Sequence, residues 1–284
     1  MNSRNTEHAA QELSPIILFS KQDVASMLVR QTLLENFNWR ETCGEKNREP
    51  IITNGTTLGI TTSTQHVYMH IDEIENLKTS LIIIASSHRS EMGIKSLHVH
   101  STGNWGPDAK LGGEPYKLSY TMAGAVGSAF RKLYEKATEM VVLRDWLVSL
   151  EVTHHGPYSP VPLIFVEFGG PPSALTCREA SIAVAEACIS AVNAVPSNRP
   201  AVGIGGNHYA PLFTKLTLDN QFDFGHMMPK YAFPHGINIL SQAFDKTLEK
   251  TNIAVIDWKG VPGTYRSEII NQLKKLGKDI VVKK

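Results

Sequence analysis

The chain has 284 residues, of which 42% are hydrophobic and 19% are charged, and its formal net charge at pH 7 is +1. This composition suits a globular protein with a sizeable core, and the near-zero net charge excludes a protein that binds nucleic acid through a global basic field. The three cysteines show no CxxC spacing, and no apolar run is long enough to span a membrane. We therefore expect a reduced, cytoplasmic protein that has no membrane partner.

The predicted secondary structure alternates between strands and helices. Residues 1–14 are polar, and we expect them to form a flexible N-terminal tail. The predicted strands cover residues 15–20, 66–72, 80–87, 95–100, 147–155, 162–170, 200–206, 252–258 and 279–282. The predicted helices cover residues 22–37, 120–148, 176–192, 237–250 and the segment after Gly263.

Three of the predicted strands are largely apolar, at 82–85, 163–168 and 253–256. Such runs are typical of strands in a mostly parallel sheet that is covered on both faces. Together with the alternation of strands and helices, they predict a single α/β domain over residues 15–284. The expected architecture is a three-layer α/β/α sandwich around a mostly parallel or mixed sheet.

Histidines follow several predicted strands, or alternate with apolar residues within them. These histidines are His88, His98, His100, His154, His155 and His208. In open α/β sheets, ligands bind outside the carboxyl ends of the strands. Several strands that each deliver an imidazole to this edge suit a metal site or an acid–base site.

Glutamates accompany these histidines at three places. His88 and Glu91 form an HxxE pattern, which is weak evidence for a zinc site by itself. Strand alternation places Glu151 and His155 on one face, so they are expected to share a pocket. Glu167 lies in an otherwise apolar strand, where a carboxylate needs a metal, an arginine or a histidine as its partner.

The segment GIGGNHYAP, residues 203–211, is a glycine-rich loop with His208 near its middle. It is not a dinucleotide fingerprint, because the sixth position is not glycine and Pro211 follows too soon. It is not a Walker loop, because no GK[ST] follows. The glycines instead indicate a turn whose N–H groups can approach an oxyanion or a phosphate.

Two further segments offer groups that suit contact with a nucleotide. HSTGNWG, residues 100–106, supplies Asn104 as a donor and Trp105 as a stacking surface. GHMMPKY, residues 225–231, supplies Lys230 and an aromatic side chain, which suit contact with a phosphate or a base.

Six segments, taken in order, resemble the archaeal and plant type of D-aminoacyl-tRNA deacylase. They are ASSHRS (85–90), LHVHSTGNWG (97–106), EVTHHGP (151–157), VEFGG (166–170), GIGGNHYAP (203–211) and GHMMPKY (225–231). The resemblance implies a cytosolic, zinc-dependent hydrolase that cleaves the ester between a D-amino acid and the terminal ribose of tRNA. It also implies a fold similar to the phosphorylase and peptidyl-tRNA hydrolase type.

The resemblance and the residues together predict metal-assisted ester hydrolysis by a monomer that binds the acceptor end of aminoacyl-tRNA and no DNA. One or two zinc ions are expected to be held by a subset of His88, His154, His155, Glu167 and His208. The expected catalytic residues are Glu151 as the proton acceptor, His155 and His208. The expected substrate-binding residues are His100, Asn104, Trp105, Gly205, Gly206, Asn207 and Lys230.

Two other enzyme classes remain open at this stage. The HxxE pattern also fits a zinc-dependent peptidase or amidohydrolase. The glycine loop also fits an enzyme of the nucleoside phosphorylase type, in which that loop would bind phosphate. A non-catalytic RNA-binding module is disfavoured by the near-neutral charge and by the clustered histidines.

Overall fold

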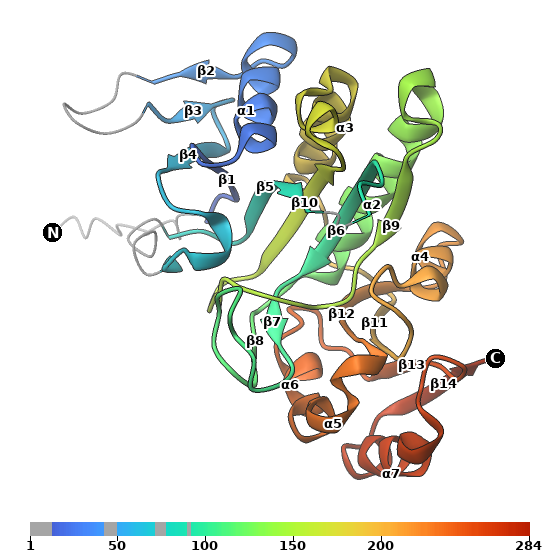
Figure 1. The fold of residues 1–284 in the computed structure, drawn as a ribbon. Helices are drawn as coiled ribbons and strands as arrows, with labels where there is room; N and C mark the ends of the chain where they lie inside the picture. Colours follow the sequence, from blue (N-terminus) through green and yellow to red (C-terminus); the bar gives the residue numbers. More distant parts are fainter. Residues whose placement is uncertain (1–12, 43–49, 72–77, 90–91) are drawn as a thin grey trace, which may run out of the picture.

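The computed structural model describes residues 13–42, 50–71, 78–89 and 92–284. An eight-stranded mixed sheet forms the upper part of the molecule in Figure 1. Its strands, in spatial order, are β2 (Arg40–Glu41), β3 (Ile52–Thr53), β4 (Leu58–Thr62), β1 (Ile16–Ser20), β5 (Ile82–His88), β10 (Leu163–Gly169), β6 (Ser96–Ser101) and β9 (Leu147–Leu150). Strands β4, β1, β5 and β10 run parallel, whereas β6 runs antiparallel to β10. The start of β6 therefore lies beside the end of β10.

A second sheet of four parallel strands forms the lower part of the molecule (Figure 1). Its strands, in spatial order, are β12 (Asp223–Met228), β11 (Pro200–Ile204), β13 (Ile253–Asp257) and β14 (Asp279–Lys283). A short ribbon pairs β7 (Gly103–Asn104) with β8 (Lys117–Leu118). The segment after β9 joins the two sheets, because the N–H of Glu151 donates to Val99 and that of Thr153 donates to Met227.

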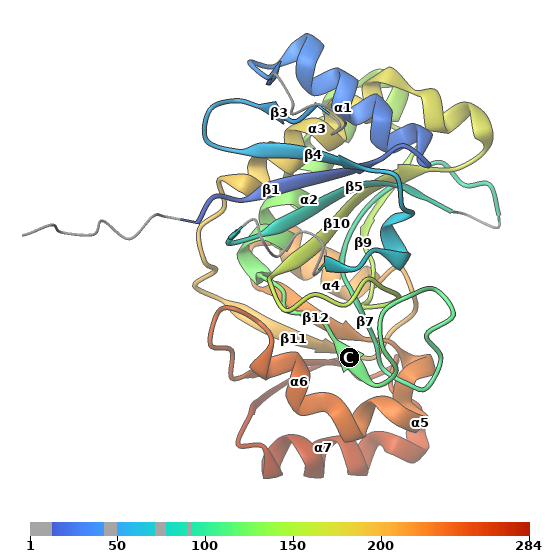
Figure 2. The same cartoon turned by 90° about the vertical axis from the view of Figure 1, so that its left-hand side faces the viewer.

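Seven helices of the described residues pack around the two sheets. They are α1 (Val24–Asn36), α2 (Ala123–Glu139), α3 (Arg178–Val192), α4 (Pro211–Leu218), α5 (Phe233–Gly236), α6 (Leu240–Asp245) and α7 (Arg266–Lys275). Helices α1, α2 and α3 cover one face of the large sheet, and α5, α6 and α7 lie below the small sheet (Figure 2). None of the described helices has the length and apolarity that a membrane crossing requires.

The two faces of the large sheet carry different side chains. On β5 and β10, Ile83 and Val166 belong to the core that is shared with α1, α2 and α3. The alternate residues of the same two strands, such as Ser86 and Glu167, point to the opposite face, because successive side chains of a strand alternate. On β6 the same alternation buries Leu97 with the helices. The polar side chains of the three strands therefore gather on the face away from these helices.

The predicted α/β class with a mixed sheet is confirmed, but several element boundaries differ. The strand predicted at 66–72 is wrong: His66–Tyr68 form a short 3-10 helix, η1, and Met69 and Ile71 pack on the sheet instead of pairing with it. The strand predicted at 147–155 ends at Leu150. The second sheet gains β12, and α4 follows the glycine loop; neither was predicted. Because residues 1–12 lie outside the described part of the chain, the flexible tail and the domain boundary stay predictions.

Candidate functional site

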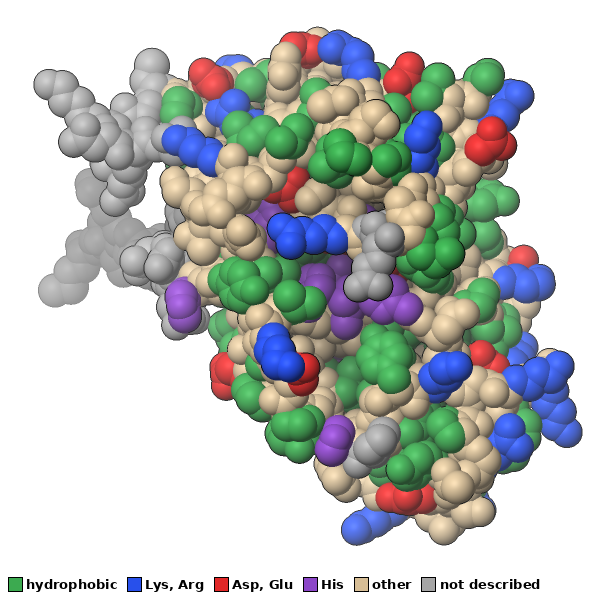
Figure 3. All heavy atoms as spheres, in the orientation of Figure 1, with side chains coloured by type: hydrophobic (Ala, Val, Ile, Leu, Met, Phe, Trp, Pro, Cys, Tyr) green, Lys and Arg blue, Asp and Glu red, His purple; other side chains and the backbone are tan. Residues whose placement is uncertain are grey.

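A cavity of about 300 Å³ lies on the polar face of the large sheet, at the carboxyl ends of β1 and β5. At one end it is lined by His154, His155 and His208, and its floor includes Phe165 and Glu167 of β10. In the space-filling view, histidine side chains gather in a hollow that lysine and arginine side chains border (Figure 3). Chain segments that are distant in sequence thus meet at the strand ends.

Two buried glutamates stand at the centre of the histidines. Glu151 is fully buried, and its carboxylate lies 3.3 Å from Nε2 of His208 and 3.4 Å from Nδ1 of His88. Three more imidazoles place Nε2 at 3.8–4.0 Å from this carboxylate, those of His98, His100 and His154. Glu167 lies 3.6 Å from His88 and 3.8 Å from His100. We call these two glutamates, with His88, His98, His100, His154, His155 and His208, the histidine–glutamate cluster.

Five of the six imidazoles of this cluster are held in one orientation by a contact at Nδ1, whereas His88 turns its Nδ1 toward the two glutamates. Nδ1 of His154 lies 2.7 Å from the carbonyl of Val152, and Nδ1 of His155 lies 2.6 Å from the carbonyl of Gly156. Nδ1 of His98 and of His100 likewise meets oxygen atoms, and Nδ1 of His208 lies 3.4 Å from the Tyr231 hydroxyl. An Nδ1–H that donates to a carbonyl leaves the Nε2 lone pair free for a metal or a proton.

The cluster leaves many polar atoms without a partner. Both carboxylate oxygens of Glu151, and Nε2 of His88, His98 and His100, are buried without a hydrogen bond to any described residue. Two ligand atoms that each lie about 2.1 Å from one zinc ion are roughly 3.4 Å apart. The Glu151 oxygens lie 3.3–4.0 Å from Nε2 of His98, His100, His154 and His208 and from Nδ1 of His88, separations that fit a metal between them. Imidazole and carboxylate are ligands that zinc accepts, as do other divalent transition metals such as iron.

Four groups of three side chains in the described residues have ligand atoms close enough to hold one ion. They are His100–His154–His155, His88–His98–Glu151, Glu151–His154–His208 and His100–Glu151–Glu167. Glu151 belongs to three of these groups. A metal site in this cluster therefore depends on Glu151 more than on any single histidine.

Burial and charge compete for the proton of each group. Burial lowers the pKa of His154 well below its ordinary value, and it lowers the pKa of His155 to about 4. For His100, burial acts in the same direction, but the carboxylates of Glu167 and Glu151 outweigh it and hold the pKa above the ordinary value. Burial raises the pKa of Glu167, but the imidazoles of His100 and His88 outweigh it and keep that pKa well below the pKa of a free carboxyl. The cluster thus combines ionised carboxylates with imidazoles whose pKa values are shifted in opposite directions, downward by burial for His154 and His155 and upward by the carboxylates for His88 and His100.

The structure brings together all the predicted metal ligands and catalytic residues. It also corrects the alternation expected after Leu150: the strand has ended, so His154 and Glu151 approach the same centre. Three residues that the sequence did not single out as site residues also belong here: His98 contacts Glu151, and His66 and Asp23 line the far end of the same cavity. For His98 a signal existed, because it shares a strand face with His100. Glu91 of the HxxE pattern lies outside the described residues.

Two of the predicted substrate-binding side chains, those of Trp105 and Asn104, are placed elsewhere. Trp105 is buried in the core below the small sheet, and its Nε1 donates to the carbonyl of Thr153. The Asn104 amide donates to the carbonyls of Gly112 and Glu114. Trp105 and Asn104 therefore hold loops in place and do not line the cavity.

The N–H groups of Gly205 and Gly206 already donate to the carbonyls of Met228 and Gly260. Both glycines have positive φ, which explains why this turn needs glycine. The two N–H groups are not available to an oxyanion, so this part of the expectation is wrong. Lys230 follows β12, and its N–H donates to the carbonyl of Gly206; its side chain is exposed and is not among those that line the cavity.

Comparison with known proteins decides the family. The family model described as D-aminoacyl-tRNA deacylase matches residues 75–281. The chain belongs to the D-aminoacyl-tRNA deacylase family. The family resemblance read from the six segments is thus confirmed, and so is the prediction of an enzyme that hydrolyses ester bonds.

Individual relatives agree with this membership. A D-aminoacyl-tRNA deacylase of Pyrococcus horikoshii is 34% identical over 276 residues, which cover 94% of this chain and 98% of the relative. One from Methanosarcina mazei is 34% identical over 274 residues, which cover 92% and 89% of the two chains. A crystal structure of a conserved protein of unknown function superimposes with a TM-score of 0.85 at 29% identity, covering 96% of each chain. The present chain therefore shares its fold with that solved structure over 96% of its length.

Proposed function

We propose that this protein hydrolyses the ester bond of D-aminoacyl-tRNA, releasing the free D-amino acid and tRNA, as a cytoplasmic monomer. Family membership supports the reaction, and the observation that carries the site is the buried Glu151 carboxylate. It lies among five imidazole nitrogens, and three of the imidazoles, those of His88, His154 and His208, line the cavity. An ester held in this cavity would meet the cluster at its open side.

Within the cluster, Glu151, His154 and His208 are the best candidates to hold a catalytic zinc ion. Two of the four groups, His100–His154–His155 and this one, have two partly exposed ligands that line the cavity, as a catalytic zinc that keeps one position open requires; of the two, this group is the one that includes the Glu151 carboxylate. The group of His88, His98 and Glu151 is buried throughout, so it fits a closed site. A zinc ion bound at the open group would act as a Lewis acid toward water and the ester carbonyl.

His155 is our candidate for the residue that accepts the proton of the attacking water. It lines the cavity, and its hydrogen bond to Gly156 keeps the proton on Nδ1 and the lone pair on Nε2. Glu151, which the sequence suggested for this role, is proposed as a ligand instead, because its carboxylate lies beneath the imidazoles with no exposed surface.

The tetrahedral oxyanion and the tRNA need further partners. The remaining backbone donors of the glycine loop are the N–H groups of Asn207 and His208, and we propose them for the oxyanion. Arg89, which lines the cavity, and Lys230 are exposed cations that we propose for the phosphates of the acceptor end.

A single assay tests this proposal. Purified protein is incubated with D-aminoacyl-tRNA and with L-aminoacyl-tRNA, with and without a chelator, and bound metal is measured in parallel. We expect hydrolysis of the D-substrate, a loss of rate in chelator and recovery with added zinc. The His208→Ala and His155→Ala variants should lose activity, whereas His235→Ala, an exposed histidine outside the cavity, should not. Full activity in chelator, without bound zinc, would overturn the metal site.

A further inference from the structure

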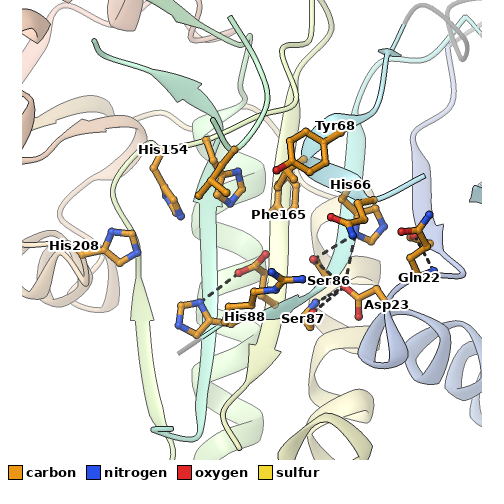
Figure 4. Close-up of a pocket in the computed structure, with 17 residues that line it drawn as sticks. Gln22, Asp23, His66, Tyr68, Ser86, Ser87, His88, His154, Phe165 and His208 are labelled. Carbon is orange, nitrogen blue, oxygen red and sulfur yellow. Dashed lines mark hydrogen bonds and ion pairs between the residues drawn. The ribbon is translucent and has the colours of Figure 1, made fainter. Parts of the chain in front are cut away.

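The end of the cavity away from His154 and His208 holds a second polar group. It consists of Asp23 and its hydrogen-bonded neighbours His66, Ser86 and Ser87, and the close-up shows these residues on the other side of Phe165 (Figure 4). Asp23 precedes α1, His66 belongs to η1, and the serines end β5. The hydrolysis proposed above uses none of these four residues.

The hydrogen bonds of this group decide where its protons lie. The Asp23 carboxylate accepts from the N–H of Ser26 and, at 2.8 Å, from the N–H of Ser87. The hydroxyl of Ser86 donates to Asp23 at 3.2 Å. Since a hydroxyl has one proton, the Ser86 oxygen is left to accept from Nδ1–H of His66 at 3.3 Å. Nε2 of His66 therefore carries a lone pair.

This order of contacts excludes a nucleophilic serine. In a serine hydrolase the histidine takes the proton of the serine, and the acid supports the histidine. Here the Ser86 proton points to Asp23, and His66 is the donor to Ser86. The group is therefore built to orient the imidazole of His66 and not to activate a hydroxyl.

Nε2 of His66 is an acceptor that lacks a donor. The side chain is 4% exposed and lines the cavity, and no described residue bonds to this nitrogen. Leaving a buried acceptor unpaired is costly, so such an atom inside a cavity suits a ligand donor. Burial lowers the pKa of His66 to about 4, although the charges of Asp23 and Glu167 oppose it, so the ring is neutral near pH 7.

The charges around this nitrogen favour a cationic donor. The Asp23 carboxylate lies 3.8 Å from Nδ1 of His66, and Glu167 also lines the cavity. The α-ammonium group of an aminoacyl ester is a cation with three N–H donors, and it is bonded to the carbon next to the ester carbonyl. The Phe165 ring lies between the two ends of the cavity, with centroids 6.2 Å from His66 and 5.2 Å from His155. One phenyl ring therefore separates the proposed ester end from His66.

We propose that Nε2 of His66, oriented by Ser86 and Asp23, accepts a hydrogen bond from the α-ammonium group of the bound aminoacyl moiety and so helps to select its hand. The inference rests on the proposed function, because it places the ester at the histidine–glutamate cluster. When the ester and the ammonium group on the α-carbon are both held, the side chains of the D- and L-residues point in different directions. His66 is thus a residue that determines specificity.

The test compares two substrates that differ only in the ammonium group. One is D-phenylalanyl-tRNA, and the other is 3-phenylpropanoyl-tRNA, in which hydrogen replaces the ammonium group. We expect His66→Ala to lower kcat/KM for the first by about 10- to 100-fold, the usual effect of losing a hydrogen bond to a charged group. For the second substrate we expect a change of no more than about twofold.

Three further variants sharpen the result. His66→Gln keeps an acceptor oxygen and should recover part of the rate on D-phenylalanyl-tRNA, and Ser86→Ala should lose part of it. His70→Ala removes an exposed histidine from the same segment, outside the cavity lining, and should match the wild type on both substrates. The ratio of D- to L-phenylalanyl-tRNA hydrolysis should fall in His66→Ala.

Other results would refute either the role of His66 or the proposed function. Equal losses of His66→Ala on both substrates show a purely structural role and refute the inference, and so does an unchanged rate on D-phenylalanyl-tRNA. A wild-type protein that leaves D-aminoacyl-tRNA intact refutes the proposed function itself, and the inference that rests on it falls with it.

Discussion

Nε2 of His208 lies 3.3 Å from a carboxylate oxygen of Glu151, although one residue follows β11 in the small sheet and the other follows β9 in the large sheet. The N–H of Val152 donates to the carbonyl of His208, so the backbones of the two segments are also joined. The glycine loop thus forms one wall of the histidine–glutamate cluster, and its histidine is one of the ligands proposed for zinc.

The first prediction concerns Glu151. The Glu151→Gln variant keeps the size of the side chain but removes the charge that the surrounding imidazoles face. Because Glu151 belongs to three of the four possible ligand groups, we expect zinc content and kcat/KM to fall together, the latter by about 100-fold or more. Metal analysis and D-aminoacyl-tRNA hydrolysis measure the two effects. Glu135→Gln, an exposed glutamate on α2, is the control, and equal zinc content in both variants would contradict the assignment.

The second prediction separates His155 from the ligands. If His155 accepts the proton of water, His155→Gln should retain zinc and lose about 10²- to 10⁴-fold in kcat, the usual contribution of a general base. His154→Gln should instead lose zinc, because Nε2 of His154 lies 3.9 Å from Glu151 in the proposed ligand group. The two neighbouring histidines are a matched pair for metal analysis. Loss of zinc in both would make His155 a ligand.

The third prediction concerns stability in acid. His226 of β12 is fully buried between the Thr153 hydroxyl and the Ser119 carbonyl, and burial lowers its pKa to about 3. In the unfolded chain, His226 binds a proton near the ordinary pKa of 6.5. In the folded chain it stays neutral until the pH falls to about 3. The contribution of His226 is therefore complete above pH 6.5 and is lost as the pH falls toward 3, by up to about 1.4 kcal/mol per pH unit.

Urea unfolding at several pH values measures this effect. His226→Gln should be less stable than the wild type at pH 7. Between pH 6.5, the ordinary histidine pKa, and pH 4, its free energy of unfolding should fall less steeply with pH than that of the wild type. Parallel slopes for the two proteins in this window would show that His226 does not carry the acid sensitivity.

The fourth prediction concerns the start of α2. Met122, which precedes the helix, provides no side-chain cap. The buried carboxylate of Glu249 replaces that cap: it accepts from the N–H of Ala123 at 2.9 Å and from that of Gly124 at 2.7 Å. Glu249→Ala would leave these donors unpaired, so we expect a loss of about 2–4 kcal/mol in the free energy of unfolding.

Chemical denaturation of Glu249→Ala and Glu135→Ala makes a matched comparison. Glu135 lies on the same helix and pairs with Lys132 at the surface, so its loss should change stability by no more than about 0.5 kcal/mol. Equal effects of the two substitutions would show that Glu249 does not cap α2.

The alternation of apolar and polar residues predicted the strands from which most side chains of the histidine–glutamate cluster extend, and the face to which those side chains point. On β6, alternation placed Leu97 and His98 on opposite faces, and the structure has them so. The local pattern also held a signal for Asp23, because an aspartate directly before an apolar helical run is a typical N-cap. These features depend on neighbours in sequence, so the sequence is enough to find them.

Other assignments failed because they depend on partners that are distant along the chain. Asn104 and Trp105 have side chains that suit a nucleotide, but their donors bond to Gly112 and Thr153 after folding. The segment that contains His66 has the composition of a strand, yet it packs over the sheet as η1. Tertiary packing overrides a weak local preference in such segments.

The sequence by itself determined the family, the mixed α/β class and the set of histidines and glutamates at the strand ends, because periodicity and ordered motifs are local properties. Only the tertiary structure decided which of them share one centre, that Glu151 lies beneath the imidazoles, and that Asp23 and Ser86 orient His66. The reason is physical: a metal site or a hydrogen-bond chain depends on separations of a few ångströms between segments that only folding brings together.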